Sequence, residues 1–336
     1  MRKLVLVSVL CGLLFGCVGG RRPVVIVYTA LDQTFSEPIL AAFEAETGID
    51  VRAVYDTEAT KTVGLVNRIV AEHGTPRCDV FWNNEIVRTV MLKRRGMLQA
   101  YRSPSAADIP AGMKDADGYW TGFAARARVL ICNTEQLRPA QRPAKILDLA
   151  DARWRGRVAL AYPLFGTTAT HAAALFVALG DAQARRFFER LKANEVVVVD
   201  GNAASKDAVV RGEVPVGFTD TDDANVAREQ GKPVSVVVPD QHEGGMGALV
   251  IPNTVALIAG APHPEQGKQL IDFLLRRGTE RLLAHSGSAQ MPVRRGVPTP
   301  DGMIRLDEVK PMAVDWDAVE RRLPDVARTM AELFVR

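Results

Sequence analysis

The chain has 336 residues, of which 47% are hydrophobic, 24% charged and 6% aromatic, and its net charge at pH 7 is +3. This composition is typical of globular proteins and excludes general disorder. So small a positive charge is not typical of nucleic-acid-binding proteins. We therefore expect a folded protein with no nucleic-acid partner.

The N-terminus has the pattern of an export signal. Arg2 and Lys3 precede an apolar run that closes with Leu14-Phe15-Gly16-Cys17, which resembles a bacterial lipobox. The run has roughly a dozen residues, too few to cross a bilayer core of ~30 Å. We predict a lipoprotein signal peptide over residues 1–16, lipid attachment at Cys17 and a tether over 17–23. The alternative is a plain secretion signal in which Cys17 is incidental.

Removal of the signal leaves about 320 residues, more than a single hydrophobic core usually supports, so two domains are expected. The apolar patterns predict strands at 23–29, 51–55, 79–82, 120–134, 158–162, 196–200, 215–219 and 247–258. They predict helices at 35–47, 59–72, 84–95, 168–179, 182–193, 203–211, 223–230, 264–276, 280–285 and 315–335. Such alternation indicates an α/β fold.

The order of these elements predicts two lobes. The first comprises residues 24–124 with about 250–300, and the second 125–249 with about 301–336. The long strands at 120–134 and 247–258 cross between the lobes and form a hinge. The C-terminal helix lies across one lobe. In open α/β sheets, ligands bind at the carboxyl ends of the strands, so we sought the site there.

A Gly166-Thr167-Thr168 turn opens a predicted helix and indicates an anion site. It combines unpaired backbone N–H groups, hydroxyl donors and the positive end of the helix dipole. Arg126 would add a bidentate donor. The alternative is an ordinary helix N-cap.

An acidic loop containing Asp220, Asp222 and Asp223 follows a predicted strand. Helix capping, recognition of a protonated amine and binding of a hard metal all remain open for it. Asp32 approaches from the other lobe. Among the aromatic residues near strand ends, Trp82 is the favoured wall for an organic ligand.

Four segments carry a resemblance to a known family: VVIVYTALDQTFSEPILAAFEAETGIDV, CDVFWNNEI, AARARVLICNT and PLFGTTATHAAAL. In this order they resemble the bacterial extracellular solute-binding proteins, in particular the group of periplasmic ferric-iron-binding proteins. The resemblance implies a two-lobed periplasmic-binding-protein fold, type II-like. It also implies an interlobe cleft that presents its ligand to an ABC permease and its ATPase.

The resemblance also implies site residues. Iron-binding members use a histidine after the first strand, a glutamate after the third and two adjacent tyrosines in the second lobe. Here these places hold Asp32, Asn84 with Glu85 beside it, and Thr221 with Asp222, so a tyrosinate iron site is absent. The anion pocket of the family maps to Gly166, Thr167, Thr168, Asn202 and Arg126. Thr219, which ends the strand before the acidic loop, completes the candidate ligand-binding set.

We therefore predict an importer component that captures a small anionic solute, a phosphorylated or phosphonate organic molecule. Ferric iron with a synergistic anion, held by Asp32 and Asp222, is the alternative. A ligand-binding sensor or envelope trafficking protein is the alternative of another class. No nucleophile elbow, zinc helix motif, phosphate loop or dinucleotide fingerprint occurs, so no enzyme and no resident cofactor are expected. We expect a monomer, lipid-anchored in the periplasm or at the cell surface, with Cys78 and Cys132 as buried thiols rather than a disulfide.

Overall fold

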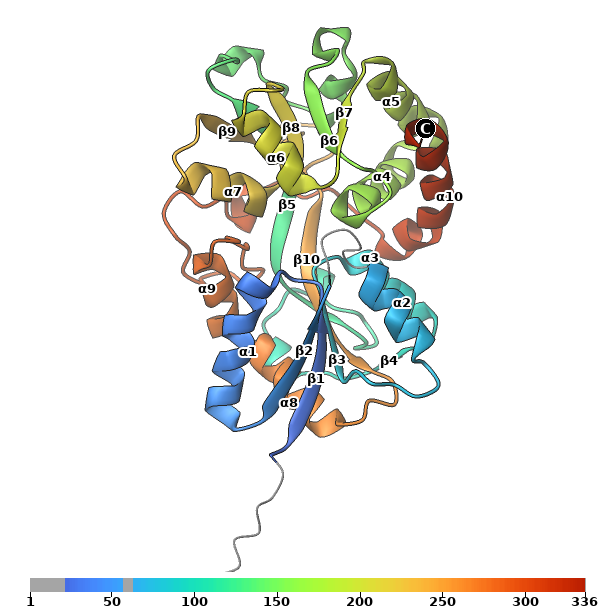
Figure 1. The fold of residues 1–336 in the computed structure, drawn as a ribbon, viewed down its shortest axis with the longest axis vertical. Helices are drawn as coiled ribbons and strands as arrows, with labels where there is room; N and C mark the ends of the chain where they lie inside the picture. Colours follow the sequence, from blue (N-terminus) through green and yellow to red (C-terminus); the bar gives the residue numbers. More distant parts are fainter. Residues whose placement is uncertain (1–21, 57–62, 336) are drawn as a thin grey trace, which may run out of the picture.

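The computed structural model describes residues 22–56 and 63–335. The predicted signal peptide and Cys17 lie outside these ranges. Two α/β lobes are stacked end to end and joined by two long strands (Figure 1). Within the described residues, no helix combines the length and apolar character needed to cross a membrane.

The strands are β1 Val24–Thr29, β2 Asp50–Tyr55, β3 Val80–Asn83, β4 Leu98–Gln99, β5 Thr121–Asn133, β6 Val158–Ala161, β7 Val197–Val199, β8 Val216–Asp220, β9 Val234–Val237 and β10 Val250–Ile258. The helices are α1 Gln33–Thr47, α2 Val63–Ala71, α3 Ile86–Arg94, α4 Gly166–Leu179, α5 Asp181–Ala193, α6 Asn202–Val210, α7 Thr221–Glu229, α8 Pro264–Leu274, α9 Arg277–His285 and α10 Trp316–Phe334. Most predicted elements are found, with ends shifted by a few residues. Neither β4 nor β9 was predicted; β4 has only two residues, and the four residues of β9 are half-buried.

Strand β5 belongs to both sheets. The first sheet has the order β2-β1-β3-β10-β5. Strand β1 is parallel to both β2 and β3, whereas β10 is antiparallel to both β3 and β5. The second continues β5-β8-β6-β7, with β6 parallel to β7 and β8. Residues 121–127 of β5 pair with β10, whereas 128–132 pair with β8. The change of partner falls between Arg126 and Arg128, so both arginines lie where the chain passes from one lobe to the other.

All thirteen residues of β5 are buried, including Arg126 and Arg128. Residues two apart in a strand point to the same face, so the two guanidinium groups emerge together. A buried charge is costly unless it is paired and hydrogen-bonded. This strand therefore requires carboxylates at the junction of the lobes.

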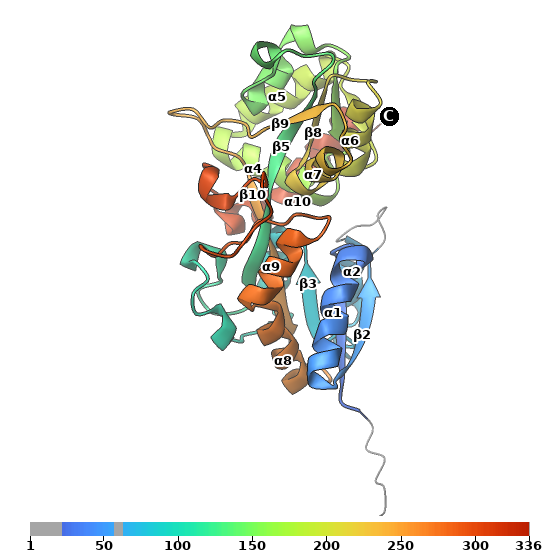
Figure 2. The same cartoon turned by 90° about the vertical axis from the view of Figure 1, so that its left-hand side faces the viewer.

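Helices cover both faces of each sheet (Figure 2). The prediction that the C-terminal helix lies across one lobe was too narrow, because α10 packs against α4 and α5 of the second lobe and also against α3 of the first. Its buried stripe contains Val319, Leu323, Val326 and Met330. An ion pair with 2.7 Å between Arg94 Nη1 and Glu320 Oε2 links α3 to α10. The helix thus ties the lobes together away from the crossing strands.

Cys78 and Cys132 are both buried free thiols, as predicted. Cys78 precedes β3 in the first lobe, and Cys132 lies near the end of β5 in the second.

Candidate functional site

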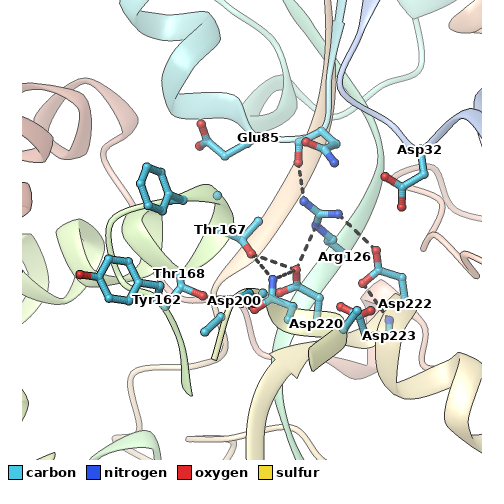
Figure 3. Close-up of a pocket in the computed structure, with 17 residues that line it drawn as sticks. Asp32, Glu85, Arg126, Tyr162, Thr167, Thr168, Asp200, Asp220, Asp222 and Asp223 are labelled. Atoms are coloured by element: carbon cyan, nitrogen blue, oxygen red, sulfur yellow. Dashed lines mark hydrogen bonds and ion pairs between the residues drawn. The ribbon is translucent and has the colours of Figure 1, made fainter. Parts of the chain in front are cut away.

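A cleft of about 150 Å³ lies between the lobes, where the carboxyl ends of β1, β3, β6, β7 and β8 converge. The loops after these strands supply its walls, as expected for open α/β sheets. The lining residues are Asp32, Asn84, Glu85, Arg126, Ala161, Tyr162, Phe165, Gly166, Thr167, Thr168, Asp200, Gly201, Asn202, Ala203, Asp220, Asp222 and Asp223. Figure 3 shows the polar members facing one another across the gap.

The structure brings most of the predicted ligand-binding residues to this cleft. The predicted residues that line it are Asp32, Asn84, Arg126, Gly166, Thr167, Thr168, Asn202 and Asp222. Asp32 comes from the first lobe and is exposed at the start of α1, whereas Asp222 lies in the first turn of α7 in the second lobe. The residues assigned to opposite lobes therefore do face a common space.

Three predicted residues do not line the cleft. Trp82 is fully buried in the first lobe, where its ring centroid lies 5.8 Å from that of Phe123, so the predicted aromatic wall is part of the core. The Thr219 hydroxyl is fully buried and lies 3.1 Å from the carbonyl oxygen of Asn202. The hydroxyl of Thr221 accepts a hydrogen bond from the backbone N–H of Ala127 at 3.1 Å. Both threonines hold backbone segments in place behind the site.

Arg128, which was not predicted as a site residue, organises the floor of the cleft. Its side chain is fully buried. Nη1 donates to Asp220 Oδ1 at 2.6 Å, to Asn202 Oδ1 at 2.8 Å and to Thr167 Oγ1 at 3.2 Å, and Nη2 donates to Thr168 Oγ1 at 3.1 Å. Arg128 and Asp220 are direct partners in the β5–β8 register, so the ion pair is a cross-strand pair.

Asp220 is the anionic centre of this network. Burial raises the pKa of its carboxyl, but the guanidinium groups of Arg128 and Arg126 outweigh burial and hold the pKa below its ordinary value. Oδ2 accepts hydrogen bonds from Thr167 Oγ1 and Asn202 Nδ2, each at 2.9 Å. The carboxylate is therefore ionised and largely satisfied from within the protein.

Arg126 lies closer to the first lobe than Arg128 does, and its guanidinium group connects the two lobes. Nη2 donates to the carbonyl oxygen of Asn84 at 2.9 Å, and Nη1 donates to Asp222 Oδ2 at 3.2 Å. Although burial lowers the pKa of this guanidinium, the nearby Asp222 and Asp220 raise it above its ordinary value. Arg126 is thus charged and already bound to acceptors, unlike the open anion-binding fork that the sequence predicted.

Carboxylates dominate the walls. The lining residues of the described chain include the acidic side chains of Asp32, Glu85, Asp200, Asp220, Asp222 and Asp223, against the single guanidinium of Arg126. Even with Arg128 counted behind the wall, acidic groups outnumber basic ones. Because the effective dielectric in such a cleft is lower than in water, this excess favours a ligand with positive charge.

The N-termini of two helices supply positive potential beside the acidic wall. Helices α4 and α6 both begin at the cleft, and neither receives a hydrogen bond from its N-cap side chain, because the N-cap residues are Phe165 and Gly201. The first-turn N–H groups of a helix have no partner within the helix and attract anions. The cleft therefore offers backbone donors beside an acidic wall.

An aromatic pair stands at the lip of the cleft. The rings of Tyr162 and Phe165 are stacked, with centroids 6.0 Å apart, and Phe165 is 47% exposed. Tyr162 and Phe165 line the cleft, in contrast to Trp82, because they follow β6 instead of lying within a buried strand. They provide an apolar surface for the carbon atoms of an organic ligand.

Glu85 lines the cleft and directly follows Asn84, which was predicted as a ligand-binding residue. Oε1 accepts from the N–H of Val87 at 2.7 Å, which caps α3, and also from Thr170 Oγ1 of the second lobe at 2.9 Å. Burial raises the pKa of its carboxyl, against the opposing effect of these hydrogen bonds. The signal that identifies it is a capping position directly after a buried strand.

His171 lies behind the site on α4 and is fully buried beside Phe218, with ring centroids 5.0 Å apart. Neither ring nitrogen has a hydrogen-bond partner among the described residues. Burial, followed by the positive charge of Arg128, lowers the pKa of His171 to about 3. The ring is therefore neutral and packed in the core of the second lobe.

We expect the His171→Phe variant to resist acid better than the wild type. The unfolded chain binds a proton near pH 6.5, whereas the folded protein does so only near pH 3, so stability is lost as pH falls through this window. At pH 4.5 the loss due to this group reaches about 2.7 kcal/mol, and phenylalanine removes it. Urea unfolding at pH 4.5 and 7.5 measures the difference. The exposed His285→Gln serves as control, and equal pH dependence of wild type and His171→Phe would contradict the prediction.

The chain is similar to known proteins over most of its length. The family model described as bacterial extracellular solute-binding protein matches residues 87–322. The chain is 26% identical to iron uptake protein A1 of Synechocystis over 323 residues, which cover 93% of this chain and 88% of that protein. It is 27% identical to a putative 2-aminoethylphosphonate-binding periplasmic protein of Salmonella typhimurium over 308 residues, 88% of this chain and 87% of that one.

The fold is shared with solved structures. The crystal structure of iron-bound HitA from Pseudomonas aeruginosa superposes with a TM-score of 0.82 at 22% identity, covering 92% of this chain and 99% of that one. The predicted two-lobed α/β fold and the family resemblance are both confirmed. With a family model that spans most of the chain, this protein belongs to the bacterial extracellular solute-binding proteins.

Proposed function

We propose that this solute-binding protein serves an ABC importer and captures a small solute that carries a compact positive charge together with an anionic group. The observation that carries the proposal is the acidic wall lying beside uncapped helix N-termini in one cleft. This narrows the phosphorylated or phosphonate solute predicted from sequence to one that also carries a positive charge, because Thr167, Asn202 and Arg126 already contact carboxylates of the protein.

The positive group is placed against Asp222 and Asp223, with Asp32 closing from the first lobe. The oxygens of Asp222 and Asp223 lie within 4.8 Å of each other and of Asp220. Asp220 is held by Arg128 behind the wall, whereas Asp222 and Asp223 lie in the first turn of α7 and line the cleft. A protonated amine matches them as a donor to carboxylate oxygens.

The anionic group is placed at the first turn of α4, where Gly166 opens the helix. The backbone N–H groups and the dipole of a fourteen-residue helix favour an oxyanion there. The short carbon chain between the charges then lies near Tyr162 and Phe165. A 2-aminoalkylphosphonate has this arrangement of charges, and one relative is named for such a solute.

Ferric iron accompanied by an anion is the second candidate. The acidic cluster supports it, since hard cations prefer oxygen ligands, and so do the names of several relatives. We place it second because Asp220, one of the three residues of the acidic cluster, already accepts hydrogen bonds on both oxygens.

Calorimetric titration of ligand-stripped protein tests this proposal. We expect 2-aminoethylphosphonate to bind in the micromolar range, about −8 kcal/mol, and ethylphosphonate, which lacks the amine, at least tenfold more weakly. Binding of ferric citrate together with no binding of 2-aminoethylphosphonate would support the second candidate, ferric iron, instead. A stronger response to ethylphosphonate than to the amine-bearing compound would refute recognition of positive charge.

We propose lipid attachment through Cys17, a monomeric state, and division of the lobes near residues 124, 250 and 300. A sensor or trafficking protein would use the same cleft. Coupling to a permease and ATPase distinguishes an importer component from these two roles.

A further inference from the structure

Asp220 occupies the N-cap position of α7 but does not cap that helix. Its side chain accepts no hydrogen bond from the first turn of α7. It turns instead toward β5, α4 and α6, where it is 1% exposed. A carboxylate at an N-cap ordinarily satisfies its own helix, so this orientation requires another explanation.

The groups around the carboxylate form a complete receptor for a small oxyanion. Arg128 Nη1 lies 2.6 Å from Oδ1, while Thr167 Oγ1 and Asn202 Nδ2 each lie 2.9 Å from Oδ2. Arg126 Nε is 3.5 Å from Oδ2. One guanidinium donor, one hydroxyl and one carboxamide thus converge on two oxygens, with a second guanidinium nearby.

The receptor is assembled from elements that are separate in sequence. Arg128 lies on the crossing strand, Thr167 in the first turn of α4 and Asn202 at the first residue of α6. Without a carboxylate here, the buried Arg128 guanidinium would keep only the neutral acceptors Asn202 Oδ1, Thr167 Oγ1 and Thr168 Oγ1. The Thr167 hydroxyl would lose the acceptor of its proton, so an empty site would be costly in free energy.

We propose that the Asp220 side chain is a tethered anion that permanently fills an oxyanion-binding site formed by Arg128, Thr167 and Asn202. Because the carboxylate is attached to the chain, its effective concentration at the site is far above that of any free anion. The anionic part of the solute therefore does not enter this site, and is left to the backbone N–H groups of α4. This inference does not depend on which solute the cleft binds.

The proposal predicts that removing the carboxylate creates a site for a free one. Asp220→Ala leaves a space about the size of formate, surrounded by the same donors. We expect this variant to melt at a lower temperature than the wild type in sodium chloride, and to recover roughly 2 °C or more in 100 mM sodium formate at matched ionic strength. The wild type should melt at the same temperature in both salts.

Asp220→Asn is the matched control, because its carboxamide still fills the site and cannot bind formate there. It should lose stability without a formate-specific recovery. If Asp220→Ala aggregates, its refolding yield from denaturant in formate against chloride replaces the melting temperature as the readout. Equal melting temperatures or equal yields of Asp220→Ala in the two salts would overturn the proposal, as would an equal formate effect in Asp220→Asn.

Discussion

Arg128→Met should lower the free energy of unfolding by about 3–5 kcal/mol, because it leaves the buried Asp220 carboxylate without its main counter-charge. The variant also removes donors to Thr167, Thr168 and Asn202. Methionine fills much of the same volume, so the loss reports charge and hydrogen bonds more than packing. Chemical unfolding at pH 7.5 measures it.

Arg185→Met is the control for this prediction. Arg185 pairs with Glu189 one helical turn away on α5, and both side chains are about half exposed. Such a pair contributes about 0.3–0.5 kcal/mol. The double variant Arg128→Met with Asp220→Leu should recover part of the lost stability, since replacing both members of a buried ion pair removes the stranded charge. A loss at Arg128 as small as that at Arg185 would show that the network does not support the second lobe.

Asp222→Asn should weaken binding of 2-aminoethylphosphonate by roughly 10- to 100-fold, because hydrogen bonds to a charged group contribute about 1.5–3 kcal/mol. The substitution keeps the size of the side chain and removes its charge from the acidic wall. Binding of ethylphosphonate should change little or improve, since the wall of the cleft loses one negative charge. Calorimetric titration of both compounds measures the change in preference.

Glu229→Gln is the control on the same helix. Glu229 ends α7, is exposed, and accepts a hydrogen bond from Asn225 at 2.9 Å, outside the cleft. It should bind both compounds as the wild type does. An unchanged affinity of Asp222→Asn for the aminophosphonate would remove Asp222 from the site and, with it, the proposed position of the amine.

The sequence predicted the fold well because the strands are apolar and the helices amphipathic. The crossing strand at 120–134 appears as Thr121–Asn133, and the predicted helix at 182–193 as Asp181–Ala193. Boundaries near the cleft were less exact: the helix expected to begin at 223 begins at Thr221, because the first turn carries the acidic residues themselves. Such residues favour both caps and first turns, so composition does not fix the start.

The site was only partly predictable. The family resemblance assigned Asp32 and Asn84, and the acidic loop after a predicted strand indicated Asp222; all three line the cleft. The rule that ligands bind at strand carboxyl ends failed for Trp82, which lies inside β3 and points into the core. A one-residue difference within a strand reverses the face to which a side chain points.

Arg128 was missed although the sequence contains a signal for it. An Arg-x-Arg pair inside a strand that is otherwise apolar places two charges on one buried face. That pattern calls for buried carboxylates nearby, and Asp220 in the opposing strand meets the need. What sequence does not reveal is that Asp220 would take the donors assigned to an external anion, because this depends on how three separate elements converge.

The most direct test of the proposed solute is the content of protein isolated from its native cells without chelators and freed of phospholipid. Phosphorus and iron per chain are measured together by elemental mass spectrometry. The proposal predicts phosphorus near one atom per chain, with little iron, from an aminoalkylphosphonate held between the acidic wall and α4. Iron near one atom per chain without phosphorus would contradict it and make Asp32, Asp222 and Asp223 ligands of a ferric ion.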